Sequence, residues 1–314
     1  MRFLRATTAV LICAACDSTN RTSADPPEQL PDVQIANDVE PASDSSEAAE
    51  VGVVVDQGGA PNDHADLEWV RIEGGTFQMG PDPLDEDEIL DPPFRVEIPT
   101  FDIMKTEVTV AQYGRCFGAG VCPWPSMEDP GGYCPKGPED STELPMRCIS
   151  WDEAQGYARW VGSEARLPTD SEWEFVARGR GRGWEFPWGD APPTCERAIM
   201  SEMSGQSGCG RHRSWPVCSR PLGNSVEGIC DLSGNISEWT EDYFIPDSTQ
   251  CTPRDGKPCL QVTLRHVIRG GNFGTIPKFL SARARTGSGR PAQNTGFRLV
   301  RPVAPESWRN PESR

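Results

Sequence analysis

Ten cysteines between positions 116 and 259 constrain the fold of this chain more than any other feature. An even number of cysteines in an exported protein is typical of a disulfide framework. Metal binding is the alternative, but no Cys-x-x-Cys spacing follows position 16, and only His64, His212 and His266 are present to complete mixed sites. We therefore predict disulfides, with the connectivity open except that Cys251 and Cys259 could close a small loop. The candidates are Cys116, Cys122, Cys134, Cys148, Cys195, Cys209, Cys218, Cys230, Cys251 and Cys259.

The composition indicates that the folded part is rich in loops. The 314 residues include 31 glycines and 30 prolines, which favours short strands over a helical bundle. Ten tryptophans still permit a substantial core. We therefore expect an α+β fold, as one irregular domain with few helices and short strands.

The first sixteen residues, MRFLRATTAVLICAAC, have the pattern of an export signal. Two arginines precede an apolar run that is too short to span a bilayer, and small residues come before a cysteine. The segment resembles a bacterial lipoprotein signal, although Cys13 stands where such signals usually carry leucine. The resemblance implies that Cys16 becomes the lipidated first residue, which would anchor the protein in the bacterial cell envelope, periplasmic or at the surface. An ordinary secretory signal is the alternative.

Residues 17–66 form an acidic segment that we predict to be a disordered tether. They hold twelve acidic side chains and a single arginine, and such a segment buries too little apolar surface to fold. The folded domain then covers residues 67–303, and residues 304–314 form a C-terminal tail. The chain from position 67 onward has a net charge of about −8, which disfavours nucleic acid as a partner.

Local patterns predict three helices and several strands. Thr109 is placed to cap a short helix to Phe117, and capping boxes at Ser150 with Glu153 and at Thr169 with Glu172 predict two amphipathic helices. The run from 69 to 80, broken by two glycines, reads as a strand pair with its turn. ARGRGRG at 177–183 reads as a basic surface turn.

Eight motifs occur in order along the predicted domain: GGTFQMG (74–80), EVTVAQY (107–113), ISWDEAQGYARW (149–160), RLPTDSEWEFVARG (166–179), FPWGD (186–190), GICDLSGNISEW (228–239), VIRGGNF (267–273) and TGFRLVR (295–301). Together they strongly resemble the formylglycine-generating enzyme, or sulfatase-modifying factor, family. The resemblance covers residues 67–303. It implies a single compact α+β domain with a C-type-lectin-like topology.

The resemblance also implies a structural calcium ion. In the family, the stretch that matches CDLSGNISE supplies oxygen ligands, which here are the side chains of Asp231 and Glu238 and the backbone carbonyls of Gly234 and Ile236. Two carboxylates and two carbonyls with water form a plausible calcium set. The alternative is a capped turn with solvated acidic side chains. A second calcium site of the family is doubtful, because Ala198 stands at its asparagine position.

The copper chemistry that the resemblance implies lacks its ligands here. Family enzymes oxidise a substrate cysteine with O₂ and a Cu(I) ion held by two cysteines after the Arg-Gly-Gly turn, and thiolates suit Cu(I). Aligned from Gly271, those positions carry Thr275 and Leu280, and Asn272 replaces the serine expected after the glycines. No cysteine follows Cys259. A second branch of the family uses iron with histidine ligands, and the predicted domain holds only His212 and His266. Copper is thus not expected, and whether any catalysis persists stays open.

We therefore expect an exported, lipid-anchored domain that acts as a binding or accessory module for a peptide, protein or glycan. Two other hypotheses remain. One is a protein-modifying oxidoreductase with a variant metal site, and the other is a purely structural envelope lipoprotein.

Overall fold

The computed structural model describes residues 66–80, 93–127, 129, 131–162 and 164–303. The predicted signal with Cys16, the predicted tether apart from Asp66, and the tail at 304–314 lie outside the described residues. These expectations stay predictions.

Two sheets contain the N-terminal strands of the domain. Strand β1 (Trp69–Ile72) pairs with β4 (Phe101–Met104), which pairs with β9 (Val300–Pro302), while β2 (Gly75–Met79) pairs with β3 (Phe94–Ile98). The prediction of one strand pair over 69–80 was therefore wrong, because β1 and β2 belong to different sheets. Gly74 marks a close approach of the backbone and not a hairpin turn: a Cβ there would lie 2.4 Å from the carbonyl oxygen of Ile98.

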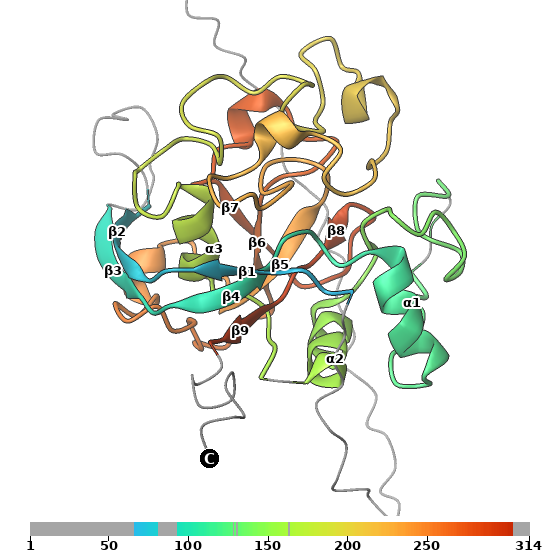
Figure 1. The fold of residues 1–314 in the computed structure, drawn as a ribbon, viewed down its shortest axis with the longest axis horizontal. Coiled ribbons are helices and arrows are strands. Elements are labelled where there is room, and N and C mark those ends of the chain that lie inside the picture. Colours follow the sequence, from blue (N-terminus) through green and yellow to red (C-terminus); the bar gives the residue numbers. More distant parts are fainter. Residues whose placement is uncertain (1–65, 81–92, 128, 130, 163, 304–314) are drawn as a thin grey trace, which may run out of the picture. The chain divides into compact units, whose positions relative to one another are not determined.

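The third sheet carries the cleft described below. Its strands are ordered β7 (Arg285–Ser288), β6 (His266–Arg269), β5 (Ser237–Tyr243) and β8 (Thr295–Gly296), with β5 and β8 parallel and the other pairs antiparallel (Figure 1). Each strand has two to seven residues, as the glycine and proline content predicts. The end of β6 leads directly into the Arg-Gly-Gly turn.

Three α-helices begin where the capping residues predict. The helices α1 (Val110–Gly118), α2 (Trp151–Val161) and α3 (Asp170–Ala177) each have both hydrogen bonds of a capping box at the N-terminus. The described residues also contain 3₁₀ helices, at Ser207–Gly210, Pro221–Gly223, Ser248–Gln250 and Pro277–Phe279.

Helix α3 is not amphipathic as its sequence suggests. Every one of its eight residues is buried, and the helix contacts β2, β3, β5 and β6 (Figure 1). Burial of Asp170, Glu172 and Glu174 requires cationic partners, since an unpaired charge in the interior is costly. Arg269 and Arg285, from distant parts of the chain, pair with Asp170 and Glu174, while the nearby Arg166 pairs with Glu172 and the nearby Arg178 with Glu174.

The core divides between two main hydrophobic clusters. One packs α1 and α2 together, with Tyr113, Tyr157 and Phe297 in ring contact. The other surrounds Trp173 and Phe175 of α3. Together with the short strands, this arrangement is the mixed α+β fold expected from the sequence. Among the described residues, no helix combines the length and apolarity needed to cross a membrane.

All ten cysteines of the described part are paired, which confirms the disulfide framework. Each disulfide joins cysteines that are neighbours in the sequence order. The pairs are Cys116–Cys122, Cys134–Cys148, Cys195–Cys209, Cys218–Cys230 and Cys251–Cys259. The small loop anticipated between Cys251 and Cys259 is among them.

Candidate functional site

The Arg-Gly-Gly turn brings positions 275 and 280 together in space. Gly270 and Gly271 have φ angles of 88° and 67°, in the region that glycine adopts without strain. A Cβ at position 271 would lie 2.9 Å from Cδ2 of Leu280 and 3.1 Å from Cγ2 of Thr275. The two positions that resemble the copper ligands therefore converge on one glycine.

The turn opens into a cleft of about 260 Å³. Its lining includes Asn272, Thr275, Ser237 and Thr286, together with the half-exposed ring of Phe279. The Thr275 hydroxyl accepts a hydrogen bond from the backbone N–H of Asn272 at 2.9 Å, and the Asn272 amide donates to the Ser237 hydroxyl at 3.0 Å. The lining thus carries hydroxyl and amide groups where the resemblance implies thiolates.

Leu280 is a core residue and not a potential ligand. It is fully buried in a small cluster with Phe186, Ala198 and Met200, and its carbonyl accepts a hydrogen bond from Ser233. A hydrocarbon side chain offers no lone pair to a metal ion.

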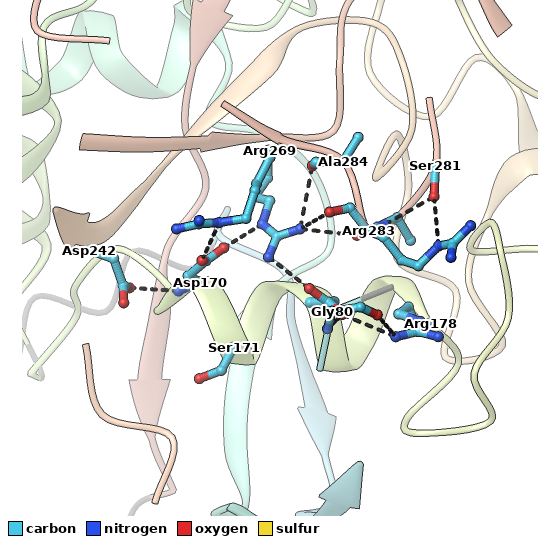
Figure 2. A network of polar contacts seen from close by, with 12 residues as sticks. Gly80, Asp170, Ser171, Arg178, Asp242, Arg269, Ser281, Arg283 and Ala284 are labelled. Carbon is cyan, nitrogen blue, oxygen red and sulfur yellow. Dashed lines mark hydrogen bonds and ion pairs between the residues drawn. The ribbon is translucent and has the colours of Figure 1, made fainter. Parts of the chain in front are cut away.

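Arg269 and Arg285, which are among the residues that line the cleft, belong to a buried ion-pair network (Figure 2). Arg269 leaves the end of β6 and pairs with Asp170, and it also donates to Glu174 at 2.8 Å. Arg285 donates to the other oxygen of Asp170 at 3.1 Å. Burial alone would raise the pKa of Asp170, but the guanidinium groups of Arg269 and Arg285 hold it below its usual value. The network fixes the strand that carries the Arg-Gly-Gly turn against α3.

Arg178 extends this network and is the exception in the predicted basic surface turn at 177–183, in which Arg180 and Arg182 are exposed. The Arg178 side chain is buried and donates to Glu174, Gln78 and Gly80. Asp242 lies at the other end, where its carboxylate accepts from the backbone N–H of Asp170 (Figure 2). Burial and the nearby Asp170 raise the pKa of Asp242 to about 8.

The predicted calcium residues lie in and just before β5. Asp231 has a left-handed φ of 59° and accepts a hydrogen bond from the backbone N–H of Cys218 at 2.7 Å. Glu238 is fully buried, and both of its oxygens accept from Arg298 at 2.7 and 2.8 Å. Trp173 donates to the same carboxylate at 3.0 Å. Neither acidic side chain is solvated, so the alternative of a turn with solvated acids does not describe this site.

Glu107 belongs to the same cluster, and sequence reasoning missed it. Burial, followed by the nearby Asp231 carboxylate, raises the pKa of Glu107 well above its usual value. Its Oε2 atom is buried without a hydrogen-bond partner, while Oε1 accepts from Asn235. The only available signal was the glutamate of the EVTVAQY motif, which reads equally well as an exposed residue before a helix.

The acidic cluster consists of Glu107, Asp231 and Glu238. Its negative charge would attract a cation, but its carboxylates alone do not form a metal site. Arg298 pairs with Glu238, and its positive charge also lowers the pKa of Glu107 and of Asp231. Burial, opposed in part by Arg298, raises the pKa of Asp231 to about 6. Yet within the described ranges no group of three or more His, Cys, Asp or Glu side chains has an arrangement that could hold a metal ion. Backbone carbonyls would have to contribute, as the resemblance implies.

The two histidines of the described domain make ordinary structural contacts. His266 stacks on Trp151 at 3.9 Å between ring centroids and lies against Tyr243. His212 forms a hydrogen bond with the Ser207 hydroxyl at 3.1 Å.

Short-stranded sheets around a buried helix, with an Arg-Gly-Gly turn that opens a cleft, define an α+β domain of the C-type-lectin-like class. The chain belongs to the sulfatase-modifying factor enzyme 1-like domain family, whose pattern matches residues 59–303.

Curated relatives of the chain differ in their named activities. It is 30% identical over 248 residues to hercynine oxygenase of Mycolicibacterium smegmatis, covering 67% of this chain and 55% of that protein. It is 35% identical over 126 residues to inactive C-alpha-formylglycine-generating enzyme 2 of Mus musculus, covering 39% of each chain. The chain thus spans about half or less of the length of these two relatives.

Solved structures agree on the fold. PvdO from Pseudomonas aeruginosa superposes with a TM-score of 0.64 at 24% identity, covering 76% of this chain and 95% of that one. A likeness at this level of identity identifies the fold and leaves the activity to be argued from the site.

Proposed function

We propose that this chain is an exported, lipid-anchored domain that binds a ligand at the bacterial cell envelope and lacks copper-dependent cysteine oxidase activity. One observation carries the proposal: Thr275 and Leu280 meet at Gly271, where the family resemblance implies two thiolates. The name of the mouse relative is consistent with loss of activity elsewhere in the family.

The other cysteines of the described domain do not offer a substitute copper site. All ten are disulfide-bonded, so they have no thiolate to give to Cu(I). The residues of the cleft therefore do not fit the metal. Thr275 has one hydroxyl, which already accepts a hydrogen bond from Asn272. Leu280 has no atom that could act as a metal ligand.

The cleft has the chemistry of a binding site for a polar ligand. Its lining combines the hydroxyls of Ser237, Thr275 and Thr286 with the amide of Asn272 and an accessible aromatic ring at Phe279. A concave site with a few convergent polar groups is the usual form of a small-ligand site. A peptide or a glycan segment would satisfy these donors.

The proposed loss of activity is tested by assaying the purified protein for the copper-dependent oxidation of a substrate cysteine. We expect no aldehyde when the purified protein is incubated with copper, a reductant and a cysteine-containing sulfatase-type peptide, because two thiolates are missing. Mass spectrometry of the peptide measures the product, and an active formylglycine-generating enzyme serves as the positive control. Aldehyde formation that disappears in a Thr275→Val variant would favour the second candidate, a protein-modifying oxidoreductase, which the name of the hercynine oxygenase relative supports.

The anchor is a separate part of the proposal. The signal-like sequence supports cleavage before Cys16 and lipidation of its thiol. The intact mass of the mature protein from its natural host measures both modifications, and a Cys16→Ser variant that stays in the membrane fraction would argue against the lipid anchor.

We also propose that calcium binds at Asp231, Gly234, Ile236 and Glu238, supported by the excess of buried carboxylate at this site and the unpaired Oε2 of Glu107. Calcium should raise the melting temperature, and at a hundredfold excess over the dissociation constant the stabilisation is about 2.7 kcal/mol. Differential scanning calorimetry with calcium or chelator measures it.

Asp231→Asn is the informative variant for the calcium site. The amide oxygen can still accept from the backbone N–H of Cys218, while the charge that attracts calcium is gone. Glu238→Gln is less informative because it also breaks the pair with Arg298. Asp255→Asn, at an exposed position, is the control. A calcium shift that is equal in wild type, Asp231→Asn and Asp255→Asn would contradict the assignment.

A further inference from the structure

Arg147 differs from the other buried arginines of this domain. Arg178, Arg269 and Arg298 each pair with a buried carboxylate. Arg147 is only 6% exposed, yet no ion pair joins it to a carboxylate in the part of the chain that the structure describes. Its Nη1 donates to the Ser214 hydroxyl at 3.0 Å, and its Nε is buried without any partner. A buried guanidinium normally requires a counter-charge.

The nearest acidic side chains are engaged elsewhere. Asp129 accepts hydrogen bonds from the backbone N–H of Cys134 and from the Gln293 amide, and Asp140 accepts from the backbone N–H of Lys136. Burial lowers the pKa of Arg147 to about 10; Asp140 and Asp129 oppose this shift in part, while Arg213 adds to it, and the group remains charged at neutral pH. Asp140 and Asp129 therefore act on Arg147 only at a distance, and no described carboxylate forms an ion pair with it.

Further arginines gather on the segment that contacts Arg147. Ser214 lies between Arg213 and Trp215, and the guanidinium groups of Arg211 and Arg220 stack on the Trp215 ring at 3.6 and 3.9 Å from its centroid. Stacking holds a guanidinium in place while its N–H groups in the plane stay able to donate. The Nε of Arg220 is also buried without a partner.

The two chain segments that carry these arginines contact residues that line a second, larger pocket. That pocket has a volume of about 560 Å³, and its lining includes Tyr133, Phe273 and Gln293. Gly208 donates its backbone N–H to the carbonyl of Phe273 and accepts from the indole of Trp215. Cys148 follows Arg147 in the sequence, and its sulfur lies 3.9 Å from the carbonyl oxygen of Gln293. Gly208 and Cys148 thus join the segments that carry Arg211 and Arg147 to residues of the pocket lining.

We propose that this arginine cluster binds the oxyanion of a small ligand, such as a sulfate or phosphate ester, whose remainder lies in the larger pocket. The cluster consists of Arg147, Arg211, Arg213, Ser214 and Arg220. Arginine donates in a planar fork that matches tetrahedral oxyanions, and the Ser214 hydroxyl adds a donor beside it. The site does not depend on the loss of copper chemistry, so it stands whether or not the family reaction is detected.

Calorimetric titration of the full chain, as the Cys16→Ser protein, with sodium sulfate and sodium phosphate tests the proposal at constant ionic strength. We expect saturable binding to wild type and a loss of about tenfold or more in affinity in Arg147→Met, because a hydrogen-bonded charge pair is removed. Arg182→Gln is the matched control, since Arg182 also stacks on an indole, that of Trp184, and is exposed. Equal affinity in wild type, Arg147→Met and Arg182→Gln would overturn the proposal, as would the absence of saturable binding to wild type.

Thermal melting separates a binding role of Arg147 from a structural one. Without sulfate or phosphate, Arg147→Met should melt no lower than wild type, because the variant removes a buried charge that has no ion-pair partner. With sulfate, wild type should gain stability beyond the general salting-out effect, which is common to all variants. If Arg147→Met does not fold, the exposed Arg213→Gln gives the test: an unchanged affinity for sulfate in that variant overturns the proposal.

Two sources of the oxyanion can be distinguished with small probes. Glucose 6-sulfate and glucose 6-phosphate carry the two esters on the same sugar, so a difference in affinity identifies the preferred group. Tighter binding of either ester than of the inorganic ion supports a role for the adjoining pocket, whereas weaker binding of both would contradict the placement of the ligand in that pocket.

Discussion

Replacing Arg269 with methionine is expected to destabilise the domain by about 3 to 5 kcal/mol, because it leaves two buried carboxylates without their main partner. Glu174 would keep Arg178 and the backbone N–H of Gly80, and Asp170 would keep Arg285. For a domain of this size, about 2 to 4 °C is lost per kcal/mol, so the melting temperature should fall by roughly 10 °C. Denaturant unfolding followed by tryptophan fluorescence measures the change.

Two further variants decide whether the geometry of the pair matters. Arg269→Lys keeps the charge but cannot donate in a fork to Asp170 and Glu174 together, so it should recover only part of the stability. Lys257→Met is the control, since the Lys257–Asp255 pair is exposed and such pairs contribute little to stability. An Arg269→Met protein as stable as Lys257→Met would show that the network does not hold the sheet against α3.

Sequence reasoning succeeded for structure that a few neighbouring residues determine. Thr109, Ser150 and Thr169 cap their helices as predicted, because a capping box involves only four consecutive residues. The disulfide framework also followed from the cysteine count, since each pair joins cysteines 6 to 14 positions apart. The family motifs then predicted the fold class.

The features that sequence reasoning missed depend on contacts between distant residues. The hydrophobic spacing of α3 gave no sign that Asp170 would be enclosed by Arg269, about a hundred positions later in the chain. Strand partners were equally hidden: β1 pairs with β4 and not with the adjacent β2. Likewise, Glu107 and Arg147 look like exposed charges in the sequence, and only the fold shows that each has a buried atom without a partner.

Removal of the Cys195–Cys209 disulfide is the second change that should lower the stability of the domain substantially. The bond closes a loop with a sequence separation of 14, and a loop of about 15 residues corresponds to about 3 kcal/mol of stabilisation in the chain-entropy account. The loop also donates backbone hydrogen bonds from Ser201 to the carbonyl of Thr275 and from Gly208 to that of Phe273. We therefore expect a Cys195→Ala/Cys209→Ala protein to lose stability and to exchange amide hydrogens faster at both residues.

The same variant links the disulfide to the arginine cluster. The bond holds the segment that leads into Arg211, Arg213 and Trp215, and an oxyanion site needs its donors in fixed positions. Loss of the bond should weaken sulfate binding even at temperatures where the domain is still folded. Cys134→Ala/Cys148→Ala is not a clean control, because Cys148 adjoins Arg147. Cys251→Ala/Cys259→Ala removes a disulfide that closes a shorter loop elsewhere, and it should leave sulfate affinity unchanged. Equal sulfate affinity in both double variants would mean that the cluster is held by the remaining contacts of Trp215, to Gly208 and Asn235, without help from the disulfide.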